Sequence, residues 1–174
     1  MDAASEPSLV FRQATVDDIP VIRALADRIW RAAYAEMLSL AQIEHMLGRM
    51  YSAATLAREI GEGIRYDLME RAGKPIGYLA ISVRPDGQQA ELHKLYLLPE
   101  LQGQGAGQVM LDHAIAVAVA AGAKRLELRV NRHNLRAQRA YLRAGFHIER
   151  ELCQDIGGGF VMDDFVMVRE LVAP

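Results

Sequence analysis

The sequence holds a single cysteine, no long apolar run and no cluster of basic residues. Cys153 alone cannot form an internal disulfide framework, and its place in a predicted strand favours a buried, small apolar role. The longest apolar run, near residues 114–121, is followed by Gly122 and Lys124 and is far shorter than a membrane span. A net charge of −2 without a basic stretch predicts no nucleic-acid partner.

The first residues, MDAASEPS, lack the basic-then-apolar order of a signal peptide. We therefore expect residues 1–7 to form a disordered tail and the protein to be cytoplasmic, with no membrane partner. A chain of 174 residues, 51% of them hydrophobic, is long enough for one sizeable core and too short for two. These features predict a single domain over residues 1–174.

A glycine-rich loop is the most informative stretch. Residues 92–98 favour a strand, which ends at Pro99, and residues 102–107 read QGQGAG before an apolar helix. Glycines let backbone amides point at an anion with no side chain in the way, and a helix N-terminus adds about half a positive charge. The order of strand, glycine loop and helix therefore predicts a phosphate-binding loop.

The spacing of this loop excludes two common phosphate motifs. No lysine and hydroxyl residue follow Gly107, as a mononucleotide loop requires, and Gln108 stands where a dinucleotide fingerprint needs its third glycine. What remains is Gln102-x-x-Gly105-x-Gly107. This pattern resembles the pyrophosphate loop of the GNAT superfamily of N-acetyltransferases, which use acetyl-coenzyme A. For the loop in isolation, a turn without a ligand is the alternative.

A second motif follows in the order that the GNAT resemblance implies. Residues 124–132 alternate apolar and polar side chains as a strand. The next residues are similar to the GNAT pattern Asn-x-x-Ala-x-x-x-Tyr-x-x-x-Gly-Phe, matched at Asn134, Ala137, Tyr141, Gly145 and Phe146. Two motifs with a strand between them extend the resemblance over roughly residues 75–150.

The remaining pattern predicts a mixed α/β chain. Periodicity and turn residues predict helices near residues 19–33, 40–47 and 56–60, and strands near 9–13, 66–71, 75–84, 89–98, 147–154 and 160–171. The resemblance implies the GNAT fold: a central, mostly antiparallel twisted sheet of six to seven strands, flanked by helices. It also implies that the two central strands splay apart and leave backbone groups free for the coenzyme.

The resemblance assigns the coenzyme site and the general acid. Tyr141 would give a proton to the leaving sulfur of coenzyme A, and packing of its helix is the alternative role. Asn134 would cap that helix and contact the coenzyme. The backbone of the strand and of the loop would bind the rest of acetyl-coenzyme A, with no metal, through Leu95, Tyr96, Leu97, Gln102, Gly103, Gln104, Gly105, Ala106 and Gly107.

The general base stays open between two residues. An alkylamine of pKa near 10.4 must lose a proton at pH 7, which costs about 4.6 kcal/mol. Glu91 and His93 lie two apart on the central strand and so share a face. Some GNAT members carry a glutamate base at the position of Glu91, whereas His93 has the more suitable ordinary pKa. We favour Glu91, and the alternative is that both simply decorate a solvated face.

Other side chains are candidates for binding. Trp30 and Tyr34, at i and i+4, would form an aromatic lip over the acceptor amine, although core packing is the alternative for Trp30. One of three arginines on the helix of Tyr141 would reach the 3′-phosphate of the coenzyme. These are Arg136, Arg139 and Arg143. Asp155, Asp163 and Asp164 would make an acidic pocket for a polyamine, or are ordinary turn and edge charges.

The expected function is transfer of an acetyl group from acetyl-coenzyme A to a primary amine, directly in a ternary complex. Tyr51-Ser52 ahead of Leu56-x-x-Glu59 is similar to bacterial small-amine acetyltransferases, including the polyamine type. Acetylation of a protein N-terminus or lysine is the first alternative. A coenzyme sensor without turnover is the second, against which Tyr141 and Glu91 argue. The resemblance also allows a homodimer.

Overall fold

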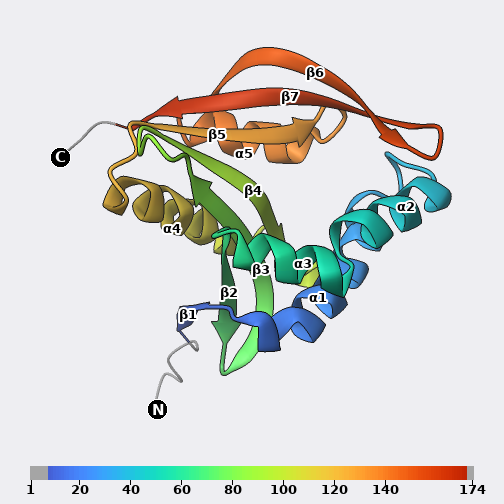
Figure 1. Ribbon diagram of the computed structural model, residues 1–174, viewed down its shortest axis with the longest axis horizontal. Coiled ribbons are helices and arrows are strands. Elements are labelled where there is room, and N and C mark those ends of the chain that lie inside the picture. The colour runs from blue at the N-terminus through green and yellow to red at the C-terminus, as the bar shows by residue number, and fades with distance from the viewer. Residues whose placement is uncertain (1–7, 172–174) are drawn as a thin grey trace.

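The computed structural model describes residues 8–171, so the predicted tail at residues 1–7 lies outside the described residues. These residues form a seven-stranded sheet in the order β1-β2-β3-β4-β5-β7-β6 (Figure 1). Only β4 and β5 pair in parallel, and the other neighbours are antiparallel. The strands are β1 (Leu9–Gln13), β2 (Arg65–Arg71), β3 (Lys74–Val83), β4 (Gln89–Leu97), β5 (Arg125–Asn131), β6 (His147–Gly157) and β7 (Phe160–Glu170).

Three of the five α-helices in the described residues begin at a polar side-chain cap: Ser39, Ser52 and Asn134. The hydroxyl and carboxylate of Thr15 and Asp18 form a capping box on a 3-10 turn that runs into the first long helix. The hydroxyls of Ser39 and Ser52 accept backbone N–H bonds at the next two helix starts. The helices are α1 (Ile19–Ala33), α2 (Leu40–Met50), α3 (Ala53–Gly61), α4 (Ala106–Ala120) and α5 (Leu135–Arg143). The predicted mixed α/β architecture is confirmed, although β6 runs further than expected, to Gly157.

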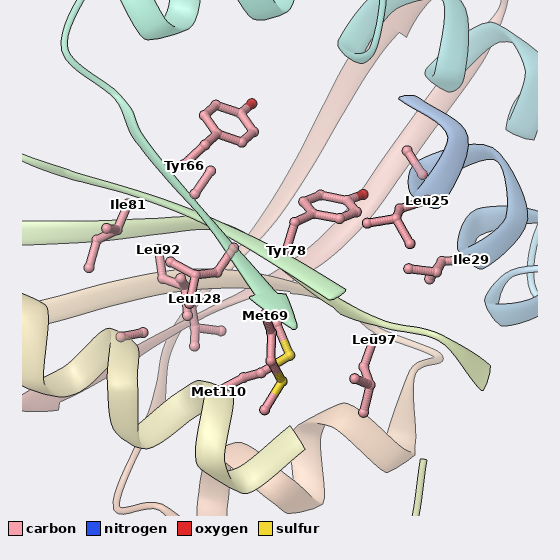
Figure 2. Packing of buried hydrophobic residues seen from close by; sticks show 14 of the residues in the cluster. Leu25, Ile29, Tyr66, Met69, Tyr78, Ile81, Leu92, Leu97, Met110 and Leu128 are labelled. Carbon is pink, nitrogen blue, oxygen red and sulfur yellow. The ribbon is translucent and has the colours of Figure 1, made fainter. Parts of the chain in front are cut away.

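Both faces of the sheet are buried. Because side chains alternate along a strand, Tyr66 and Tyr78 lie on the face covered by α1 and α3, whereas Met69 points the other way. Figure 2 shows Met69 directed at Met110 of α4, with both tyrosine rings on the opposite side of the strands. All four side chains are fully buried. Residues from both covering layers, such as Ile29 of α1 and Leu111 of α4, line the cavity of the candidate site.

The two central strands separate part-way along their length. β4 and β5 pair from Gln89↔Arg125 to Leu92↔Leu128, and both strands continue without pairing to each other. The pairing of β3 with β4 shifts at the same place, because Ala80 opposes Lys94 while Ile81 opposes Leu92. The extra residue, His93, is therefore a β-bulge, which bends and twists the strand locally. The predicted splay of the central strands is confirmed.

The hairpin of β6 and β7 reaches across the molecule to α2 (Figure 1). Gln42 of α2 donates to the carbonyl oxygen of Val161 at 3.0 Å, and His45 Nε2 lies 2.9 Å from the carbonyl oxygen of Ile156. β6 is the edge strand, and most of its side chains are exposed. The prediction of a buried Cys153 is therefore wrong: the residue lies in β6, as expected, but it is exposed. In the described part of the chain, no helix has the length and apolarity to span a membrane.

Candidate active site

A cavity of about 600 Å³ opens where β4 and β5 separate. Its walls come from β4, the glycine loop, β5 and α5. Of the residues that we assigned to the coenzyme, it is lined by Leu95, Tyr96, Leu97, Gln102, Gly103, Gly105, Gly107, Asn134 and Tyr141. The side chains of Gln104 and Ala106 do not line it: the first bonds to the carbonyl oxygen of Glu100 and the second is buried. Their assigned role depends on their backbone amides.

The glycine loop presents those amides. Gly103 and Gly105 have φ values of +80° and +84°, which glycine adopts without strain, and Gly105 is the N-cap of α4. Within residues 8–171, the amides of residues 103–107 donate no backbone hydrogen bond. Unpaired consecutive amides at a helix N-terminus make an anion-binding concavity. The loop therefore fits the diphosphate of coenzyme A, and the cavity beyond it has room for the pantetheine arm.

One of the three arginines on α5 is tied to this loop. Arg136 donates to the side-chain oxygen of Gln102 at 2.9 Å and lies next to Gly103. Arg136 and Arg143 line the cavity, whereas Arg139 does not. Of the three arginines, Arg136 is therefore the one that contacts the glycine loop.

Asn134 and Tyr141 meet the cavity from opposite ends of α5. The Asn134 side chain accepts the Ala137 N–H at 3.2 Å, so its predicted capping role is confirmed. Burial raises the pKa of the Tyr141 phenol above its ordinary value of 10.0. The phenol therefore keeps its proton at neutral pH, as a general acid must. Its ring packs against Phe146 with the centroids 5.9 Å apart.

The predicted aromatic lip is a buried wall. Trp30 is 1% exposed and donates to the Tyr51 hydroxyl at 3.2 Å. Tyr34 is also buried, and its hydroxyl lies 3.3 Å from that of Tyr96 on β4. The centroids of the Trp30 and Tyr34 rings lie 4.6 Å apart, and the ring planes are tilted by 37°. Trp30 still faces a cavity, although a different one from the cavity that Tyr141 lines.

This second cavity has a volume of about 240 Å³. It shares five wall residues with the first, so the two adjoin across the bulged part of β4. The shared residues are Leu92, His93, Lys94, Tyr96 and Arg129. Three carboxylates line it from three elements: Glu59 of α3, Glu91 of β4 and Asp164 of β7. Met46, Met50 and Met162 supply apolar, adaptable wall.

Glu91 and His93 lie together, as predicted. His93 Nε2 is hydrogen-bonded to the Ser82 hydroxyl at 2.7 Å, and its Nδ1 approaches Glu91 Oε1 to 3.6 Å, which is too long for a hydrogen bond. Burial is the main cause that lowers the pKa of His93 below 6.5, partly opposed by Glu91. Arg129 approaches Glu91 to 4.0 Å. Glu91 lines only the second cavity, whereas His93 lines both cavities.

Lys94 is a site residue that the sequence reasoning missed. The bulge at His93 turns it to the same face as Glu91, where its side chain is 3% exposed. Its ammonium donates to Glu59 at 2.7 Å and also to the Tyr66 hydroxyl. A strict two-residue alternation points Lys94 the other way, so only the bulge reveals its position.

Comparison with known proteins agrees with this geometry. A model of the acetyltransferase (GNAT) family matches residues 28–146, which include the splayed strands, the loop and Tyr141. The chain belongs to the GNAT family. It is thus an N-acetyltransferase that depends on acetyl-coenzyme A, and the sensor alternative falls away.

Two relatives extend over nearly all of this GNAT chain. An uncharacterized N-acetyltransferase of Mycobacterium bovis is 35% identical over 156 residues, covering 89% of this chain and 99% of that protein. The spermidine N(1)-acetyltransferase of Thermoplasma acidophilum is 26% identical and covers 90% and 96% of the two chains. Among solved structures, the PaiA N-acetyltransferase of the same organism, in complex with coenzyme A, matches with a TM-score of 0.80 and 26% identity, over 94% of this chain and 99% of that one.

Proposed function

We propose that this GNAT enzyme acetylates a small primary amine of the polyamine kind. The observation that carries the proposal is the second cavity, which is small, holds three carboxylates and adjoins the coenzyme cavity at the bulge in β4. The wall also holds two cations, Lys94 and Arg129, so the carboxylates outnumber the cations by one and a cationic amine is the favoured ligand. The relationship to a spermidine acetyltransferase supports the same class of acceptor. A cavity of about 240 Å³ suits a short aliphatic chain better than a folded protein surface.

Tyr141 acts as the general acid in this proposal. The neutral amine attacks the thioester carbonyl, the C–N bond forms as the C–S bond breaks, and the sulfur takes the phenol proton. The new amide nitrogen then releases its extra proton to solvent, and the phenolate regains a proton from solvent. The high pKa of the buried phenol keeps that proton available at neutral pH. Backbone groups of Leu95, Tyr96 and Leu97 hold the pantetheine arm and the acetyl oxygen, because β4 no longer pairs with β5 at these residues.

Glu91 acts as the general base, reached directly or through a water. Glu91 lines the second cavity, which we take as the acceptor cavity. His93 instead has one ring nitrogen near Glu91 and the other hydrogen-bonded to Ser82. His93 therefore orients the Glu91 carboxylate. Glu91 accepts the ammonium proton, whose removal from a free alkylamine at pH 7 costs about 4.6 kcal/mol.

The function is tested by turnover with a panel of acceptors. We expect purified protein to release coenzyme A thiol from acetyl-coenzyme A with small aliphatic amines, and to form the N-acetyl product by mass spectrometry. Acetyl-coenzyme A alone raises the melting temperature by mass action, and the amine adds a second increment. Turnover of peptides or ribosomal proteins in preference to all small amines contradicts the proposal and favours the N-terminal or lysine alternative.

Arg136 is expected to recognise the 3′-phosphate of the coenzyme. Arg136→Ala should raise the KM for acetyl-coenzyme A about tenfold, the equivalent of about 1.4 kcal/mol. Acetyl-dephospho-coenzyme A, which lacks that phosphate, should show the same KM with both proteins. Arg139→Ala is the matched control, because Arg139 lies on the same helix but does not line the cavity. A tenfold effect that persists with the dephospho donor instead means that Arg136 acts by holding Gln102.

A further inference from the structure

Among the described residues, one carboxylate of the acceptor cavity forms no close ion pair and has an oxygen without a hydrogen bond. Lys94 neutralises Glu59 at 2.7 Å, and Arg129 and His93 approach Glu91 to 4.0 and 3.6 Å. Asp164 is 8% exposed, and within residues 8–171 its buried Oδ1 has no hydrogen-bond partner. A buried carboxylate without a partner is unfavourable in its charged form unless a cation joins it. Such a group persists where binding of a ligand offsets the penalty.

The position of Asp164 separates it from the general base. Asp164 pairs with Asn131 at the end of β5, whereas Glu91 pairs with Glu127 on the same strand. Glu127 and Asn131 lie four residues apart on β5, which is about 13 Å of strand at roughly 3.3 Å per residue. The carboxylates therefore stand toward opposite ends of one cavity. A single ammonium at Glu91 leaves Asp164 without a partner.

We infer that the acceptor carries a second ammonium group and that Asp164 binds it. This inference rests on the proposed function and adds the residue that selects diamines over monoamines. The amine that reacts sits at Glu91, where it loses its proton, while the amine at Asp164 keeps its charge. The methionine side chains that line the cavity supply apolar contact for the methylene chain that links the two amines.

The other acidic candidates do not share this role. The Asp163 carboxylate, on the neighbouring residue of β7, pairs with Arg132 at 3.0 Å. Asp155 accepts the backbone N–H of Gly157 at 2.8 Å in the hairpin turn. Neither lines the cavity. Of the three aspartates that the sequence offered for a polyamine pocket, the geometry leaves Asp164 alone.

The charge of Asp164 changes near physiological pH. Burial raises its pKa from 3.8 to about 6, with Arg129 opposing the shift and Asp163 adding to it. Above this value Asp164 is ionised and binds an ammonium, and below it the neutral acid does not. The titratable or charged groups around it, besides those two, are Tyr34 at the end of α1, Glu59 of α3, and Glu91, His93 and Lys94 of β4.

The experiment compares putrescine with butylamine, which have the same chain length but two and one amino groups. For the unchanged enzyme we expect kcat/KM to favour putrescine by about 10- to 100-fold, mainly through KM, the range for a hydrogen bond between charged groups. Asp164→Asn should remove this preference by raising the KM for putrescine toward the KM for butylamine. Asp163→Asn, the matched control from the same strand, should keep it. The Asn variant should fold, because it replaces an unpaired buried charge with a neutral amide.

A second measurement needs no variant. The KM for putrescine should rise as the pH falls through about 6, whereas the KM for butylamine should follow only the groups common to both acceptors. An equal preference in the Asp164→Asn variant and the unchanged enzyme, or identical pH profiles for the two amines, overturns the inference. Absence of turnover with every amine overturns the proposed function instead, so the two failures are distinct.

Discussion

Tyr141→Phe should lower kcat about 100-fold and change the KM for acetyl-coenzyme A by less than threefold. The variant keeps the ring that packs against Phe146 and removes only the proton donor. General acids contribute about 10²- to 10⁴-fold. We expect the low end, because a thiol of pKa near 8.5 already leaves well and a phenol of raised pKa is the weaker acid of the pair. Steady-state rates of thiol release, with saturating amine, measure the effect.

The control for this variant is another buried tyrosine that lines neither cavity. The Tyr78 hydroxyl donates to that of Tyr51 at 2.7 Å inside the core. Tyr78→Phe should lower the stability by about 1 kcal/mol, as the loss of one buried hydrogen bond does, and leave kcat nearly unchanged. If Tyr141→Phe lowers kcat no more than Tyr78→Phe does, the phenol is a packing residue and the sulfur takes its proton from water.

The parts of the fold that the sequence predicted are those specified by local signals. The caps at Thr15 and Ser52, the glycine loop and the motif from Asn134 to Tyr141 each depend on residues within a few positions of one another. Their structural outcome follows from capping and left-handed φ angles, which distant residues change little. The splay of β4 from β5 came from the family resemblance, since no period in either strand reveals where pairing stops.

Local sequence signals could not predict the acceptor cavity, because its walls come from elements that are far apart in the sequence. Glu59 comes from α3, Met46 from α2 and Asp164 from β7. The sequence provided no reason to prefer one of the three aspartates as a ligand for a polyamine. Only the pairing of β7 with β5 distinguishes Asp164 from the other two. The prediction that Cys153 is buried was wrong for a related reason. Strand alternation predicts which face a side chain lies on, but only the order of the strands in the sheet shows that β6 lies at an edge.

The bulge at His93 is the clearest case of a feature that a strand pattern hides. Alternation groups positions 91, 93, 95 and 97 on one face. The register instead puts Lys94 opposite Ala80 and Glu91 opposite Ser82, so these two share a face and Leu95 turns away. A single extra residue thereby places a lysine in the acceptor cavity and makes it contact Glu59. Bulges near active sites redirect side chains in this way.

Lys94→Met should lower the free energy of unfolding by about 3 kcal/mol. The methionine fills a similar volume but leaves Glu59 and the Tyr66 hydroxyl without their cation. Loss of one partner from a buried ion pair costs about 3 to 5 kcal/mol, and the 21% exposure of the Glu59 side chain puts this pair at the low end. The ammonium also lies 5.0 Å from the Tyr51 ring, a contact that the variant loses. Urea denaturation followed by fluorescence measures the change.

The double variant Lys94→Met with Glu59→Gln separates the two causes of this loss. If the stranded Glu59 carboxylate dominates, neutralising it should recover more than half of the lost stability, because a neutral pair of similar volume is tolerated in a buried site. If the double variant is as unstable as the single one, packing of the lysine stem holds the region together and the ion pair contributes little. The double variant should also keep the preference for putrescine over butylamine, since that preference depends on Asp164 and not on the neutralised carboxylate of α3.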